Sequence, residues 1–154
     1  MKEKITPGKQ DIAENGIKYF NNGYNCAQSV LFALYDQICP QSNDLIPKIA
    51  AGFGGGIGRC GSVCGALTGS IMAVGVKYGS NEANREKLGK VYTYASKLYK
   101  EFENQQGTTV CKDLIKYNLS NSEEAAKARE EKVFDKVCAN LIRTAIKNFL
   151  EVEK

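Results

Sequence analysis

The sequence of 154 residues contains no histidine. This absence excludes every site that needs an imidazole: Ser-His and Cys-His nucleophile pairs, histidine ligands of zinc, a proximal haem ligand and C-x-x-C-H haem attachment. Six cysteines remain as the main soft, redox-capable groups of the chain. Any metal or redox chemistry is therefore expected to depend on thiols.

Two further motifs are absent, and a third occurs without the structural context that it needs. No C-x-x-C pair occurs, so the sequence encodes neither a thioredoxin-type dithiol nor a zinc ribbon. No G-x-x-x-x-G-K-[S/T] occurs, so a phosphate-binding P-loop is unsupported. The letters G-x-G-x-x-G occur at residues 56–61, but a dinucleotide fingerprint needs a buried strand before it, and residues 45–51 have a helical pattern. Nucleotide binding is therefore not expected.

The charge and hydropathy of the chain favour neither nucleic acid nor membrane as a partner. Lys and Arg number 21 against 17 Asp and Glu, and the formal net charge of +4 is spread along the chain. Residues 1–10 lack the apolar stretch of a secretory signal, and the longest uncharged stretch, 60–76, is too short and weakly apolar to span a bilayer. We expect a cytoplasmic protein, in which cysteines serve as metal ligands or redox groups rather than structural disulfides.

Helical periodicity dominates the sequence, strand signals are nearly absent, and no repeat or linker interrupts it. This predicts a single all-α domain over residues 1–154, a bundle of about five to seven helices with a glycine-rich segment before and within the central helix. The predicted helical segments are 8–22, 25–38 with Pro40 as its stop, 44–51, 62–78, a long helix capped by Asn81 that reaches 105 or 106, 110–117, and a final segment from 121 or 122.

The long predicted helix carries an apolar face with heptad-like spacing. Its members are Leu88, Val91, Tyr92, Ala95, Leu98, Tyr99 and Phe102. Such a face is typical of packing in a core or between subunits. A homodimer is therefore one of the partners that the sequence suits.

Gly61, Gly65 and Gly69 recur every four residues, which predicts that they share one helical face. Glycine inside a helix costs about 0.5–1 kcal/mol relative to alanine, so the face needs a compensating contact. A neighbouring helix at very close range is the commoner reason, because small residues let backbones approach. A cofactor laid against bare backbone is the other reason, and the two are compatible because Cys64 lies beside this face.

Three cysteines fall at predicted helix starts. Cys26 directly follows the N-cap Asn25, which forms a capping box with Gln28, while Cys64 and Cys111 each stand two residues after a candidate cap. The candidate caps are Ser62 and Thr109. Free backbone N–H groups and the helix macrodipole stabilise anions there. We therefore expect these thiols to have pKa values below the free value of about 8.5.

The other three cysteines are placed differently. Cys138 lies in the middle of a predicted helix on its apolar face, where it serves as a core residue or as a fourth ligand that faces the other three. Cys60 is four residues before Cys64, and Cys39 precedes Pro40 at a helix end. The roles of Cys39 and Cys60 stay open at this point.

Asn25-Cys26-Ala27-Gln28, then Cys64-Gly65-Ala66-Leu67-Thr68-Gly69, then single cysteines at 111 and 138, resemble the C_GCAxxG_C_C family of redox-active proteins. The resemblance covers nearly the whole chain and implies Cys26, Cys64, Cys111 and Cys138 as the family cysteines. It also implies a redox role in an anaerobic organism. A related domain in split-Soret cytochromes carries an iron–sulfur centre, which suggests a cluster here. The haem of those cytochromes is not expected in this protein, because the sequence contains no C-x-x-C-H.

These observations support three hypotheses. The leading one is an electron carrier or oxidoreductase that binds an iron–sulfur cluster through the four family cysteines, with Gly65 and Gly69 beside it, and serves a redox partner protein. The second is a cluster-free thiol–disulfide oxidoreductase that uses Cys64 with Cys111 or Cys60. The third is a structural zinc site in a helical interaction module.

Overall fold

The chain folds into α-helices throughout the residues that the computed structural model describes, 8–39 and 41–154. The helices are α1 (Lys9–Asn21), α2 (Cys26–Ile38), α3 (Leu45–Ala50), α4 (Gly65–Tyr78), α5 (Arg85–Gln106), α6 (Cys111–Ile115), α7 (Ser122–Glu130) and α8 (Ala139–Glu151). A 3₁₀ turn (Ala51–Phe53) follows α3, and a π-helical turn (Phe134–Cys138) precedes α8. The all-α prediction is confirmed. The predicted stop at Pro40 and residues 1–7 lie outside the described residues.

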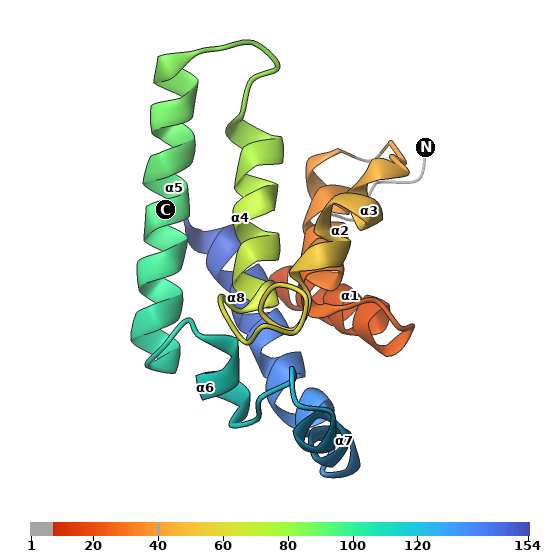
Figure 1. Ribbon diagram of the computed structural model, residues 1–154. Helices are drawn as coiled ribbons and strands as arrows, with labels where there is room; N and C mark the ends of the chain where they lie inside the picture. The colour runs from red at the N-terminus through yellow and green to blue at the C-terminus, as the bar shows by residue number, and fades with distance from the viewer. Residues whose placement is uncertain (1–7, 40) are drawn as a thin grey trace.

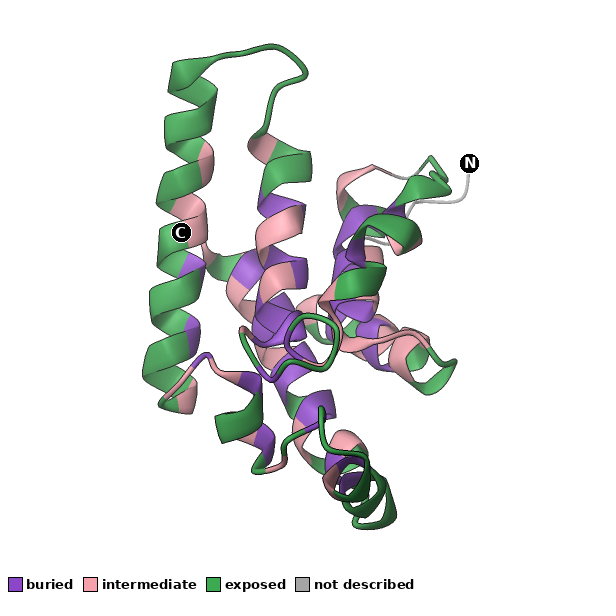
Figure 2. Ribbon diagram, in the orientation of Figure 1, coloured by how far each residue is buried: buried purple, intermediate pink, exposed green. Residues whose placement is uncertain are grey.

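Helix α4 occupies the centre of the molecule (Figure 1). It packs between α2 and α5 and contacts α8, which passes behind its N-terminal end, while α1 packs on α2 and α8. Burial is concentrated where α2, α4 and α8 meet (Figure 2). The largest fully buried side chains there are Leu31, Leu34, Leu67, Ile142 and Ile146. This packing holds the N-terminal ends of α2 and α4 close together.

Two glycines allow α4 to lie directly on the start of α2. A Cβ added at Gly69 would stand 2.6 Å from the carbonyl oxygen of Ala27, and one at Gly65 would stand 3.2 Å from the Ala27 nitrogen. Both residues therefore permit a backbone approach that any side chain would block. Gly61 does not share this face: it precedes the helix, in a loop, with φ +69°.

Helix α4 begins at Gly65, later than the predicted start near Ser62. Residues 62–64 are instead held in extended conformation by an antiparallel bridge between Val63 and Val110. The same bridge delays α6, whose N-cap is Val110 and not the predicted Thr109. Long-range backbone pairing has overridden the local capping signals at both sites.

The prediction for the long helix, α5, is wrong at its start and correct at its end. Its N-cap is Asn84, whose side chain accepts a hydrogen bond from the Lys87 N–H at 2.9 Å, so the prediction of Asn81 is wrong. The helix ends at Gln106, in agreement with the predicted end at 105 or 106, and Gly107 follows it with φ +81°. On its heptad-like face Leu98 and Phe102 are buried, whereas Leu88, Tyr92 and Tyr99 are exposed.

The predicted final helix is divided in two. Asn121 caps α7 by accepting hydrogen bonds from the N–H groups of Glu123 and Glu124, each at 3.0 Å. After α7 the backbone adopts φ +55° at Lys132, and the chain re-enters helix through the π-helical turn. The division explains why residues 8–39 and 41–154 form eight α-helices where five to seven were expected.

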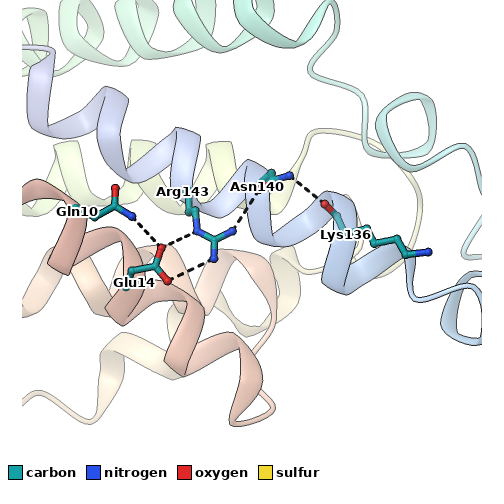
Figure 3. A network of polar contacts seen from close by, with 5 residues as sticks. All are labelled: Gln10, Glu14, Lys136, Asn140 and Arg143. Atoms are coloured by element: carbon teal, nitrogen blue, oxygen red, sulfur yellow. Dashed lines mark hydrogen bonds and ion pairs between the residues drawn. The ribbon is translucent and has the colours of Figure 1, made fainter.

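An ion pair joins α1 to α8 (Figure 3). The Arg143 Nε donates to Glu14 Oε1 at 2.7 Å, and the same guanidinium donates to Asn140 Oδ1 at 3.2 Å. Gln10 also donates to Glu14 Oε1, at 3.1 Å. The hydrogen bond from Arg143 lowers the pKa of the Glu14 carboxyl.

Arg143→Gln is expected to lower stability at about pH 7 by no more than about 1 kcal/mol, because both partners are partly exposed. A carboxyl whose folded pKa is depressed contributes stability above its unfolded pKa and loses it as the pH falls through the folded pKa. Urea unfolding should therefore show a difference between variant and wild type that disappears in strong acid. An equal difference at neutral and acidic pH would contradict this account, and Lys48→Gln, an exposed cation outside the observed ion pairs, serves as the control.

Candidate thiol site

Four cysteines from four separate segments line one enclosed cavity of about 40 Å³. They are Cys26, Cys64, Cys111 and Cys138. The cavity lies where the starts of α2, α4 and α6 meet the π-helical turn. The fold thus brings together the four cysteines that the family pattern implied.

Cys26 is placed by the capping box that begins α2. The Gln28 N–H donates to Asn25 Oδ1 at 3.0 Å, and the Asn25 N–H donates to Gln28 Oε1 at 3.1 Å, as the sequence predicted. The same side chains donate onward to the carbonyls of Ala51 and Pro47, each at 2.8 Å. Cys26 is therefore held at the first position of a helix whose start is anchored to α3.

Cys64 and Cys111 are brought together by the bridge between Val63 and Val110. The Cys64 N–H donates to the Thr109 carbonyl at 2.8 Å, and the Cys111 N–H donates to the Ser62 carbonyl at 2.6 Å. Cys64 is the N-cap of α4, and Cys111 is the first residue of α6. Two residues 47 positions apart in the chain thus lie beside each other at paired helix starts.

The glycine-rich loop folds back over these helix starts (Figure 1). Residues 55–59 all have φ between +53° and +67°. Glycine is required most clearly at Gly56, where a Cβ would stand 2.6 Å from both the Ser62 nitrogen and the Cys111 Cβ. Gly55 lines the thiol cavity itself. The run that resembled a nucleotide fingerprint is therefore a loop that closes the thiol cavity.

Cys138 reaches the cavity from the last residue of the π-helical turn. A π turn contains one more residue than an α turn, so it rotates the side chains that follow it, and such turns often occur at functional sites. Cys138 is buried, with Phe134 and Leu141 of the same segment also lining the cavity. The inward orientation that the sequence predicted is confirmed, but the π turn carried no sequence signal that we recognised.

The cavity walls are apolar apart from the thiols. The lining residues other than cysteine are Gly55, Gly65, Ile115, Leu119, Phe134 and Leu141. Gly65 is thus part of the site, whereas Gly69 packs one turn further along α4 against α2. Within the described residues, no three Cys, Asp or Glu side chains already stand in an arrangement that could hold a metal ion.

The expected lowering of the thiol pKa values is wrong. Burial raises the pKa of Cys64 to about 12, and burial together with the neighbouring Cys64 thiol raises that of Cys111 to about 12. Contact with the Cys138 thiol, followed by burial, raises the pKa of Cys26. The N–H groups of Ala66 and Leu67 do act to lower the pKa of Cys64, as a helix start should, but desolvation in the apolar cavity is the larger effect.

The remaining two cysteines do not line the cavity. Cys60 is exposed on the glycine-rich loop, and Cys39 is partly buried beside the end of α2. Cys60 therefore differs from the cavity thiols in its access to solvent.

Alkylation of the reduced, metal-free protein should modify Cys60 before any cavity cysteine. Burial and a pKa near 12 leave Cys64 and Cys111 with little thiolate near neutral pH, so their reaction should be at least about 100-fold slower. Mass spectrometry of peptides after timed iodoacetamide treatment measures these rates, and treatment in urea, where all cysteines should react alike, is the control. A cavity cysteine that reacts as fast as Cys60 would contradict the burial.

The fold and site define a small all-α protein in which four thiols from distant segments line one cavity, three of them buried and Cys26 partly exposed. The chain belongs to the C_GCAxxG_C_C family: the family model described as "Putative redox-active protein (C_GCAxxG_C_C)" matches residues 24–152, which include all four cavity cysteines.

Comparison with curated proteins finds an uncharacterized protein of Archaeoglobus fulgidus. It is 32% identical over 105 residues, which cover 64% of this chain and 70% of the relative. No solved structure matches the chain significantly. Within the described residues, no helix has the length and apolar character needed to cross a membrane.

Proposed function

We propose that Cys26, Cys64, Cys111 and Cys138 bind an iron–sulfur cluster and that the protein transfers electrons to or from a partner protein in the cytoplasm. The observation that carries the proposal is the convergence of four thiols from four segments on one enclosed cavity. Thiols collected in this way from distant parts of a chain are unusual for a purely apolar core. The family description, redox-active, agrees with this chemistry at the coarser level.

The donor set fits such a cluster. Four cysteine thiolates are the usual ligands of [2Fe–2S] and [4Fe–4S] clusters, and the absence of histidine excludes mixed ligation of the Rieske type. Four thiolates in an apolar cavity would repel one another, and the positive iron ions offset that repulsion. A bound cluster would supply one-electron redox chemistry, while the chain supplies four sulfur ligands in largely apolar surroundings.

Two features of the chain would tune the centre. The N–H groups of Ala66 and Leu67 face the Cys64 sulfur, and hydrogen bonds to ligating sulfurs raise the reduction potential of a cluster. The exposed glycine-rich loop, with Ile57 at 44% exposure, provides a surface close to the cavity. We place the electron partner at this loop, because Gly55 of the loop lines the thiol cavity.

A second candidate is a cluster-free thiol–disulfide oxidoreductase. It is favoured by the position of Cys64 and Cys111, which directly follow the two residues of the Val63–Val110 bridge, and by the contact of Cys26 with Cys138. Oxidation of one such pair would form one S–S bond and release two electrons and two protons to an oxidised partner disulfide. Cys60, the other partner considered for Cys64, is exposed and outside the cavity.

Anaerobic purification from an iron-replete host tests the proposal. The protein should be brown, with visible absorption bands that bleach on reduction, and with iron and sulfide in equal amounts. Colourless, iron-free protein would overturn it. In that case one specific disulfide after mild oxidation would support the oxidoreductase, and one zinc ion per chain would support the structural zinc site.

A further inference from the structure

An open cleft of about 580 Å³ adjoins the thiol cavity. Cys26, Gly55, Leu119 and Phe134 line both spaces, so these residues form the wall between them. The rest of the cleft wall comes from the end of α1, the loop after it, the glycine-rich loop, α7 and the π-helical turn. Phe20, Tyr24 and Ala125 are the apolar residues among these. The cleft therefore gives solvent and small molecules a route to the Cys26 side of the thiol centre.

Two arginines stand at the outer part of this cleft. Arg59 and Arg129 line the cleft and also a second, open depression, so both residues lie where the two spaces adjoin. Arg59 belongs to the glycine-rich loop, where its carbonyl accepts a hydrogen bond from the Ser120 hydroxyl at 3.0 Å. Arg129 lies in the last turn of α7. Residues 70 positions apart are thus brought to the same opening.

Among the residues that the structure describes, no side chain is recorded in an ion pair or hydrogen bond with either guanidinium group. Within residues 8–39 and 41–154, the three ion pairs involve other cations, and no side-chain hydrogen bond is donated by Arg59 or Arg129. Asp135 also lines the cleft, but it does not pair with either arginine. One carboxylate against two guanidinium groups leaves the cleft with an excess of positive charge.

We propose that this cleft binds a small organic anion, with its carboxylate or phosphate on Arg59 and Arg129 and its apolar part directed toward Cys26. Guanidinium groups bind planar or tetrahedral oxyanions through two parallel N–H donors, which makes them selective for this class. The apolar wall favours a ligand with a carbon skeleton over an inorganic ion. The cleft is large enough for such a ligand.

The inference goes beyond the proposed function and does not depend on a cluster. The arginines, the apolar wall and the opening belong to the metal-free chain, so binding is measurable before any metal is loaded. If a cluster is bound, the ligand would lie beside the Cys26 edge of the redox centre, which is the position of a substrate. If the chain binds no cluster, the anion site is unaffected.

Titration of the metal-free, ¹⁵N-labelled chain tests the proposal, with benzoate as the probe and benzamide as its neutral counterpart. Benzoate should shift the amide signals of Gly23, Gly55 and Asp135 saturably, whereas benzamide should bind at least about tenfold more weakly because it lacks the charge that the guanidinium groups pair with. The double variant Arg59→Gln/Arg129→Gln should weaken benzoate binding at least about tenfold.

The matched control is Lys48→Gln/Arg85→Gln, which removes the same charge from exposed sites outside the cleft. It should bind benzoate like the wild type, and the cleft variant should retain wild-type helicity and iron content. No saturable shift at the cleft, equal binding of benzamide, or equal weakening in both double variants would overturn the proposal. Inorganic phosphate, as a second probe, tests whether the apolar wall contributes to binding. Tighter binding of phosphate than of benzoate would overturn the proposal that the ligand has an apolar part.

Discussion

Cys64→Ser is expected to abolish iron binding while it changes the stability of the metal-free chain by less than about 1 kcal/mol. Cys64 is the N-cap of α4, and serine is among the best N-cap residues, so the hydroxyl can accept hydrogen bonds from the first N–H groups of the helix. An alcohol is a much poorer ligand for iron than a thiolate. The variant therefore separates the ligand role of this residue from its structural role.

Two measurements test this prediction. Iron and sulfide content after anaerobic purification reports the ligand role, and urea unfolding of the metal-free protein reports the stability. Cys39→Ser and Cys60→Ser are the matched controls, because neither residue lines the thiol cavity. Both should retain wild-type iron and colour. Full iron content in Cys64→Ser, or its loss in Cys60→Ser, would contradict the ligand set, and the second result would make Cys60 a ligand in place of a cavity cysteine.

Gly69→Ala should destabilise the protein by about 2 kcal/mol, although alanine is the better helix former. The added Cβ would stand 2.6 Å from the Ala27 carbonyl oxygen, a backbone atom that cannot turn aside. Relief requires α4 to move away from α2, and Cys26 immediately precedes Ala27. The variant should therefore also disturb the thiol cavity and reduce iron content.

Gly75→Ala is the matched control in the same helix. No heavy atom lies within 4 Å of a Cβ added there, so the substitution should stabilise α4 by about 0.5–1 kcal/mol. Thermal or urea unfolding should thus show that the change in unfolding free energy has opposite signs for these two glycine-to-alanine substitutions in the same helix. If Gly69→Ala is as harmless as Gly75→Ala, or if Gly65→Leu folds and binds iron normally, the close approach of α4 to α2 is wrong.

Local sequence signals predicted those parts of the fold whose cause is local. The capping box of Asn25 and Gln28, the start of α7 at Ser122 and the end of α5 at Gln106 all agree with the predictions from the sequence. These features are decided by groups within a few residues of one another. The glycines at 65 and 69 also indicate a close contact, because a helix tolerates glycine at such spacing only when another segment lies close, but the spacing does not say which segment.

Predictions failed where distant segments interact. Helix α4 begins at Gly65 and not near Ser62 as predicted, because residues 62–64 pair with residues 109–111. Neither stretch contains a sequence signal that indicates this pairing. Burial reversed the pKa shift expected from helix starts, since the N–H groups that favour a thiolate at Cys64 are outweighed by the apolar cavity. The π-helical turn that contains Cys138 forms where the sequence predicts ordinary α-helix.

The sequence by itself determined which soft, redox-capable ligands the chain offers: it has no histidine, and its cysteines stand in the family pattern. It also determined the all-α class, because periodicity is a local property of the chain. Only the tertiary structure decided which thiols meet, how strongly they are desolvated, and that a cleft with Arg59 and Arg129 opens beside Cys26. These features depend on packing between residues far apart in the chain, and the free energy of that packing is not encoded in any one segment.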